Sequence, residues 1–168
     1  MLLSMVHNGR FTIANIGDSA AMLLKQNGKM LKLTDEQTPD RDDEYNRIVR
    51  NNGLISMKND IARVDGVLAV SRAIGDMQQK QNLIPESETY NYQIQPNDDL
   101  LILSSDGLYL VYSEEEVSKM VYELRKQGMP LNKISQKITD EACTNYYCKD
   151  NVTMMIIDLK KHYHDFHR

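Results

Sequence analysis

The run Leu100-Leu101-Ile102-Leu103 leads directly into Ser104-Ser105-Asp106-Gly107, and this stretch is the strongest indication of the fold. Four consecutive apolar residues before a turn signal are typical of a buried strand, and Asp-Gly marks the turn that follows it. Asp150 has a similar setting, because it precedes a second apolar run over residues 154–159. Each aspartate therefore stands at the end of a strand, where a rigid element can hold its charge at the edge of a sheet.

A third aspartate repeats the arrangement, because Asp18 follows the strand-like residues 11–16 inside Gly17-Asp18-Ser19. Carboxylate oxygens are the ligands that hard cations such as Mg²⁺ and Mn²⁺ prefer. Three carboxylates at strand ends indicate a hydrolase that works through metal ions. The alternative is that Asp-Gly and Asp-Asn mark ordinary turns, as each dipeptide alone commonly does.

The order of the expected elements, strands first and then helices packing on them, indicates an α+β fold with antiparallel sheets. Asn27-Gly28 favours a tight hairpin, since both residues tolerate positive φ. Strands are expected at residues 11–16, 20–25, 29–33, 54–57, 61–64, 89–95, 99–103 and 154–159.

Three helices are expected. The first covers residues 42–52, with Tyr45, Ile48 and Val49 on one face and Gly53 as its stop. The second begins at the capping box Ser113–Glu116 and ends at Gly128, and Pro130 suits the first turn of the third.

Length and composition favour one domain over residues 1–168. Apolar residues make up 41% of the 168 residues, which argues against disorder and is enough for one hydrophobic core. The net charge of −4 gives no basic footprint for nucleic acid or an anionic membrane. No apolar stretch approaches the roughly 20 residues that span a bilayer, and residues 1–6 are too short for a secretory signal. We therefore expect an intracellular protein, cytoplasmic by default, with no nucleic-acid or membrane partner.

Cys143 and Cys148 are too few for a disulfide framework. Zinc would need further ligands, which His162 and His164 in the tail at residues 160–168 could supply. The favoured alternative is that both cysteines are half-buried apolar residues and that the tail is a frayed terminus.

Several motifs follow one another in order between about residue 10 and residue 159. The most specific is Leu68–Asp76, and the others are Ala14–Ser19, Leu33–Pro39, Glu44 with Arg47 and Ile48, Arg63–Gly66, Ser104–Leu108 and Asp150–Thr153. This succession resembles the metal-dependent protein serine/threonine phosphatases of the 2C family. The resemblance implies a four-layer sandwich of two antiparallel sheets flanked by helices, in which residues 40–64 form a flap-like subregion.

The same resemblance implies a phosphoprotein substrate and a pair of Mg²⁺ or Mn²⁺ ions. It assigns Asp106 and Asp150 as catalytic metal ligands and Asp18 as a ligand, with Asp106, of a third and weaker metal. Family members often carry a second Asp where this chain has the aliphatic Leu110, which cannot ligate Mg²⁺. Asp106 and Asp150 are therefore the stronger candidates.

Other residues of the same motifs are expected to support the aspartates or the fold. Ser105 and Asn151 are expected to orient the turn rather than touch metal. Arg72 and Asp76 are as readily a buried structural pair as a phosphate contact.

Members of the family open with a segment that contains Asp-Gly-His-Gly-Gly, which this sequence lacks. The resemblance therefore implies an N-terminally incomplete catalytic domain, whose partial site binds metal weakly or not at all. Sheet edges left unpaired would favour self-association or pairing with a missing N-terminal segment.

Three functional hypotheses stay open. The chain is part of a phosphatase, a catalytically inactive phosphatase-like binding or regulatory module, or a half-domain that contributes Asp106 and Asp150 only when assembled. The retained aspartates favour the first over the second, because clustered carboxylates are costly to keep without a use. The absent N-terminal motifs favour the third over the first for this chain as given.

Overall fold

The computed structural model describes residues 1–76, 78, 81–145 and 149–160. Contacts within the chain divide it into two compact units. The first comprises residues 1–3, 14–19 and 35–89, and the second comprises residues 4–13, 20–34 and 90–168. Each unit has a buried apolar cluster of its own.

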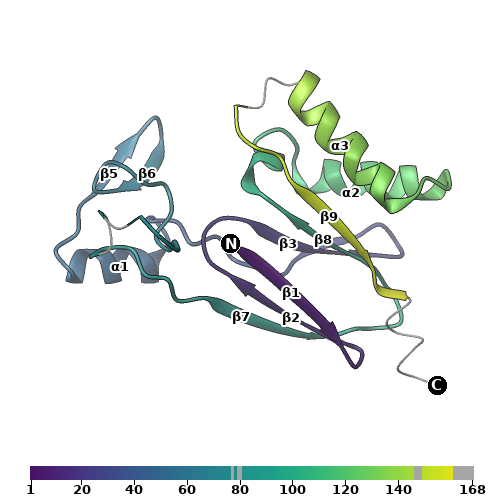
Figure 1. Ribbon diagram of the computed structural model, residues 1–168, viewed down its shortest axis with the longest axis horizontal. Coiled ribbons are helices and arrows are strands. Elements are labelled where there is room, and N and C mark those ends of the chain that lie inside the picture. The colour runs from purple at the N-terminus through teal and green to yellow at the C-terminus, as the bar shows by residue number, and fades with distance from the viewer. Residues whose placement is uncertain (77, 79–80, 146–148, 161–168) are drawn as a thin grey trace. The chain divides into compact units, whose positions relative to one another are not determined.

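The second unit is built on a four-stranded antiparallel sheet with the order β4-β3-β8-β9 (Figure 1). These strands are β3 (Ala20–Lys25), β4 (Met30–Lys32), β8 (Asp98–Ser104) and β9 (Met154–Asp158). The register places Ser104, the last residue of β8, opposite Ala20 on one side and Met154 on the other. The end of β8 is therefore held from both sides. A slip of one residue would turn its buried side chains to the opposite face.

Two helices, α2 (Glu114–Lys126) and α3 (Leu131–Asn145), pack on one side of this sheet (Figure 1). Their apolar residues recur at helical spacing and so form one inward stripe on each helix. Full burial of such a side chain contributes about 1.5–3 kcal/mol relative to exposure. The shared buried cluster includes Met22, Leu24, Leu100, Ile102, Val117, Val121, Ile134, Ile138 and Ala142.

The capping box at the start of α2 is confirmed. The Ser113 Oγ accepts a hydrogen bond from the Glu116 backbone N–H at 3.2 Å, and the Glu116 carboxylate accepts one from the Ser113 backbone N–H at 2.8 Å. Hydrogen bonds from the backbone and side chain of Ser113 hold the pKa of the Glu116 carboxyl below its usual value. Gly128, with φ +82°, follows the helix as predicted.

Replacing Ser113 with alanine is expected to lower the free energy of unfolding by about 1 kcal/mol, because the first turn of α2 loses its cap. Urea denaturation followed by circular dichroism measures the change. Ser113→Thr keeps the hydroxyl and is expected to retain most of the stability. Equal losses in both variants would contradict a capping role for the hydroxyl.

The first unit contains helix α1 (Asp42–Arg50) and a hairpin of β5 (Ile55–Lys58) and β6 (Ile61–Val64). Its small core consists of Ile48, Val64 and Leu83. Of the apolar face predicted for α1, only Ile48 is buried, whereas Tyr45 and Val49 are exposed.

Helix α1 ends before Gly53, and the residue with positive φ is Asn52, at +60°. Asparagine tolerates this left-handed conformation better than most residues do. Gly53 serves close packing instead, because a Cβ there would lie 2.7 Å from side-chain atoms of Ile48 and Asn82. The expectation that Gly53 itself stops the helix is therefore wrong.

A third sheet has the order β1-β2-β7, with β1 (Leu2–His7), β2 (Arg10–Asn15) and β7 (Glu88–Gln93). The sequence analysis did not predict β1. Asn8 and Gly9, with φ +50° and +68°, turn the chain between β1 and β2. This Asn-Gly pair between two apolar runs is the same hairpin signal as Asn27-Gly28 and could have revealed the strand.

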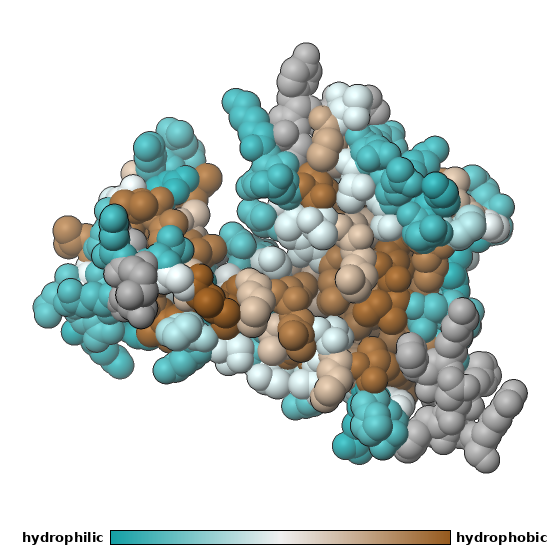
Figure 2. Space-filling view, viewed as in Figure 1, coloured by the Kyte–Doolittle hydropathy of each residue, from teal (hydrophilic) through white to brown (hydrophobic). Residues whose placement is uncertain are grey.

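The α+β class with antiparallel sheets is confirmed. Among the described residues no helix is both long and apolar enough to cross a membrane, and hydrophilic residues cover α2 and α3 in Figure 2.

Cys143 is a free thiol on α3 and is exposed, so its predicted half-burial is wrong; neighbouring Ala142 takes the inward position. Cys148, His162 and His164 lie outside the described residues.

Candidate active site

Asp106 opens a single 3₁₀ turn, η2 (Asp106–Leu108), directly after β8. Its backbone oxygen accepts hydrogen bonds from the backbone N–H of Tyr109 at 2.8 Å and of Leu110 at 3.2 Å, which closes the turn. Leu108 is fully buried and anchors the turn in the core, whereas Asp106 is half-buried. Strand and core together fix the position of Asp106 and leave it partly exposed.

Ser105 joins this turn to the segment that carries Asp150. Its Oγ donates to the Asn151 backbone oxygen at 2.9 Å and accepts from the Thr153 backbone N–H at 3.0 Å. The Ser105 backbone N–H also donates to the Thr153 oxygen at 3.1 Å. The structure therefore brings together the segments of Asp106 and Asp150, as their places at the ends of paired strands suggest.

Gly107 lies against the same segment. A Cβ built on it would be 2.6 Å from the Asn151 backbone oxygen and 3.5 Å from the Cβ of Asp150. Asp150 is exposed, and its carboxylate accepts a hydrogen bond from the Asn151 backbone N–H at 2.7 Å. The two segments are thus in direct contact beside both aspartates.

The donor chemistry of this pair fits a hard divalent cation. Mg²⁺ typically binds through one or two carboxylates and keeps several waters, which two partly solvated aspartates allow. The Ser105 hydroxyl is engaged by two backbone groups, so it serves the turn rather than offering a ligand. This agrees with the orienting role expected for it.

Asp18 belongs to the first unit, whereas Asp106 and Asp150 belong to the second. The turn before it is held by Gln37, whose Oε1 accepts from the Gly17 backbone N–H at 2.7 Å. Asn15 donates to the Gly17 oxygen at 3.1 Å, and both polar side chains are fully buried. Asp18 is therefore on a rigid turn, and its grouping with Asp106 stays a prediction.

A buried ion-pair network in the first unit was missed from the sequence. The side chain of Glu44 is 2% exposed, and its two oxygens accept from Arg72 at 2.6 Å and Arg47 at 2.8 Å. Arg72 also bonds Glu88 at 3.0 Å, and Arg41 pairs with Glu88 and Asp43. The three-residue spacings of Glu44 from Arg47 and from Arg41 were the local signals of this network.

The carboxylates of Asp43, Glu44 and Glu88 lie within 4.8 Å of one another, a grouping that could hold a metal ion. Arg41, Arg47 and Arg72 contact the same carboxylates. Because these guanidinium groups already balance the negative charge, we interpret the cluster as a structural ion-pair network rather than a metal centre. A salt-bridged Arg72 is as expected, but its partners are Glu44 and Glu88 rather than Asp76.

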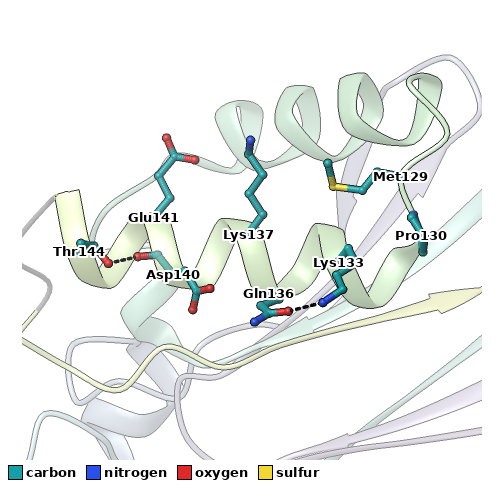
Figure 3. A pocket seen from close by; sticks show the side chains of 8 residues that line it. All are labelled: Met129, Pro130, Lys133, Gln136, Lys137, Asp140, Glu141 and Thr144. Carbon is teal, nitrogen blue, oxygen red and sulfur yellow. Dashed lines mark hydrogen bonds between the residues drawn. The ribbon is translucent and has the colours of Figure 1, made fainter.

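An open cavity of about 690 Å³ lies along α3 (Figure 3). Lys133 donates to Gln136 at 3.1 Å there, and Lys137 and Glu141 extend from the same helix. None of the candidate aspartates is among the residues that line it. The cavity therefore adds nothing to the aspartate site.

A family model described as "Protein phosphatase 2C" matches residues 1–152 of this chain. "Protein phosphatase 2C 16" of Arabidopsis thaliana is 35% identical over 175 residues, which cover 95% of this chain and 34% of that protein. "Protein phosphatase 1F" of Mus musculus is 34% identical over 151 residues, covering 89% of this chain and 32% of that protein.

Solved structures agree with these similarities. A phosphatase from a pathogenic strain of Toxoplasma gondii superposes with a TM-score of 0.78 and 31% identity, over 88% of this chain and 48% of that one. A sex-determining protein of C. elegans has a TM-score of 0.86 at 24% identity, over 98% of this chain and 42% of that one, and shows the likeness of fold alone. The chain thus spans about a third to a half of the length of the relatives it matches.

Proposed function

Because this chain belongs to the protein phosphatase 2C family, we propose that it is part of a protein serine/threonine phosphatase and supplies Asp106 and Asp150 as ligands of Mg²⁺ or Mn²⁺. The observation that carries this proposal is the junction between the two aspartate segments, where Ser105 bonds both Asn151 and Thr153. The substrate class is a phosphoserine or phosphothreonine side chain of a protein.

The chemistry is hydrolysis of a phosphate ester. A divalent cation bound at the pair supplies positive charge beside the phosphate and makes water a better nucleophile by lowering its pKa. A bond forms between a water oxygen and phosphorus, and the bond from phosphorus to the serine or threonine oxygen breaks. The proton that the attacking water loses ends on the leaving oxygen, through solvent, and inorganic phosphate is released.

In this scheme the three candidate aspartates of the chain act as metal ligands. Asp106 and Asp150 provide the negative charge that retains the cation, and they lie on the segments that follow β8 and precede β9. Their partial exposure leaves room for a phosphorylated side chain. Asp18 is the weaker candidate ligand, because the family's second aspartate is replaced in this chain by the aliphatic Leu110, which cannot ligate a cation.

Together with a segment that carries Asp-Gly-His-Gly-Gly, the chain is expected to release phosphate from a phosphothreonine peptide in the presence of Mn²⁺, and to lose this activity when EDTA is added. Colorimetric phosphate release measures the rate, and electron paramagnetic resonance of Mn²⁺ measures binding of the ion. A chain that neither binds Mn²⁺ nor turns over even when that segment is added would contradict the proposal. Binding of the phosphopeptide without turnover would favour the inactive binding module instead.

A further inference from the structure

We infer that Ser105 and Gly107 together form a positioning clamp that sets the separation of the Asp106 and Asp150 carboxylates. This inference rests on the proposed function of that aspartate pair. The Ser105–Gly107 clamp contacts no reacting atom, so both residues act through the ligands beside them.

The Ser105 hydroxyl supplies the first half of the clamp. It uses its donor on the Asn151 oxygen and an acceptor lone pair on the Thr153 N–H, so a single side chain spans two backbone groups. The antiparallel pairing of β8 and β9 ends at Ser104 and Met154. Beyond that point Ser105 continues the connection and keeps the two chain segments from separating. An alanine would leave the Asn151 and Thr153 groups to water.

The missing side chain of Gly107 supplies the second half. Its φ is outside the left-handed region, so glycine is not needed there for backbone conformation. Glycine is needed for space, because a Cβ would meet the backbone oxygen of Asn151 at 2.6 Å. A backbone atom cannot rotate away as the end of a flexible side chain can. Any side chain at this position would therefore push the segment that begins at Asp150.

The two contacts act at the ligands themselves. Ser105 and Gly107 are the immediate neighbours of Asp106, and both touch Asn151, the immediate neighbour of Asp150. One residue pulls the segments together and the other sets how closely they approach. Mg²⁺ demands near-ideal geometry at short distances, so a small change in this separation is costly.

The test measures Mn²⁺ affinity by electron paramagnetic resonance for the full chain and its Ser105→Ala variant. Groups that orient metal ligands typically change affinity by 10–100-fold, so we expect a weakening of about tenfold or more. Ser105→Thr restores the hydroxyl and is expected to recover most of the affinity. Gly107→Ala is expected to weaken binding although both aspartates and the Ser105 hydroxyl remain.

Ser118 provides a matched control. Its Oγ donates to the Gly28 oxygen at 2.6 Å, so Ser118→Ala also removes one hydroxyl bond to a backbone carbonyl. Gly28 follows β3, whereas Ser104 pairs with the first residue of β3, so the control lies toward the opposite end of that strand. We expect Ser118→Ala to leave Mn²⁺ affinity unchanged.

Unchanged affinity in Ser105→Ala, or an equal loss in Ser118→Ala, would overturn the clamp and leave the proposed function standing. A wild-type chain that binds no Mn²⁺ even with a segment carrying Asp-Gly-His-Gly-Gly added would instead contradict the proposed function. In that case the rate of hydrogen exchange at the Thr153 amide, which donates to the Ser105 Oγ, tests the clamp without metal. Faster exchange in Ser105→Ala supports the clamp, and unchanged exchange overturns it.

Discussion

Replacing Asp106 with asparagine is expected to lower the Mn²⁺-dependent rate of phosphopeptide hydrolysis by about a hundredfold to a thousandfold. A bound metal contributes several kcal/mol of transition-state stabilisation, and each 1.36 kcal/mol corresponds to a factor of ten in rate. Asparagine keeps the size of the side chain but removes the charge that would retain the cation. The 3₁₀ turn is closed by the backbone oxygen of Asp106, so this variant is expected to fold.

Asp140→Asn is the matched control, since Asp140 is exposed on α3 and the change in net charge is the same. Phosphate release from a phosphothreonine peptide, measured over a range of Mn²⁺ concentrations, gives both the maximal rate and the Mn²⁺ requirement. Equal activity of Asp106→Asn and Asp140→Asn would exclude Asp106 from the metal site.

Replacing Glu44 with glutamine is expected to lower the free energy of unfolding by about 3–5 kcal/mol, the usual cost of removing one partner of a buried ion pair. The carboxylate of Glu44 is 2% exposed and accepts hydrogen bonds from Arg72 and Arg47. Without its charge Arg47 loses its ion-pair partner, and Arg72 is left with Glu88. Urea denaturation measures the change. Asp43→Asn is the control, because its side chain is 61% exposed and such a pair contributes about 1 kcal/mol at most.

The same denaturation experiment repeated against pH checks the electrostatic cause. Burial opposes ionisation of Glu44, but the hydrogen bonds from Arg72 and Arg47 outweigh it and hold the pKa of Glu44 below its ordinary value. A group whose pKa is lowered on folding stabilises the protein fully above its unfolded pKa, about 4.3 for glutamate. That contribution is lost as the pH falls through the lower folded pKa. The difference in the free energy of unfolding between wild type and Glu44→Gln should therefore narrow below about pH 4. A difference that stays constant with pH would contradict the role of the Glu44 charge.

Local patterns predicted most of the strands and helices, because their signals are contained in short stretches of sequence. The run before Asp106 and the capping box at Ser113 needed no knowledge of distant residues. Strand β1 was missed although Asn8-Gly9 carried the signal. Gly53 was misassigned because its close neighbours include Asn82, which no local pattern brings near it.

The candidate site was predictable in kind but not in detail. The positions of Asp106 and Asp150 after and before apolar runs indicated a shared sheet edge. The contact between Gly107 and the Asn151 oxygen could not be inferred, since it depends on the register of β8 against β9. The Glu44 network also could not be predicted, because Glu88 is distant in sequence and joins it only in the folded chain.

The position of β8 between β3 and β9 also affects when this sheet can form during translation. Its partner β3 precedes it in the chain, but β9, its other neighbour, is the last of the four strands to leave the ribosome. Domains form as their residues emerge, and pairing between distant strands is slow. A nascent chain halted before residue 150 would contain three of these four strands and the Asp106 turn, but nothing for Ser105 to bond. The junction between the segments of Asp106 and Asp150 can therefore form only after residues 151–158 have been synthesised.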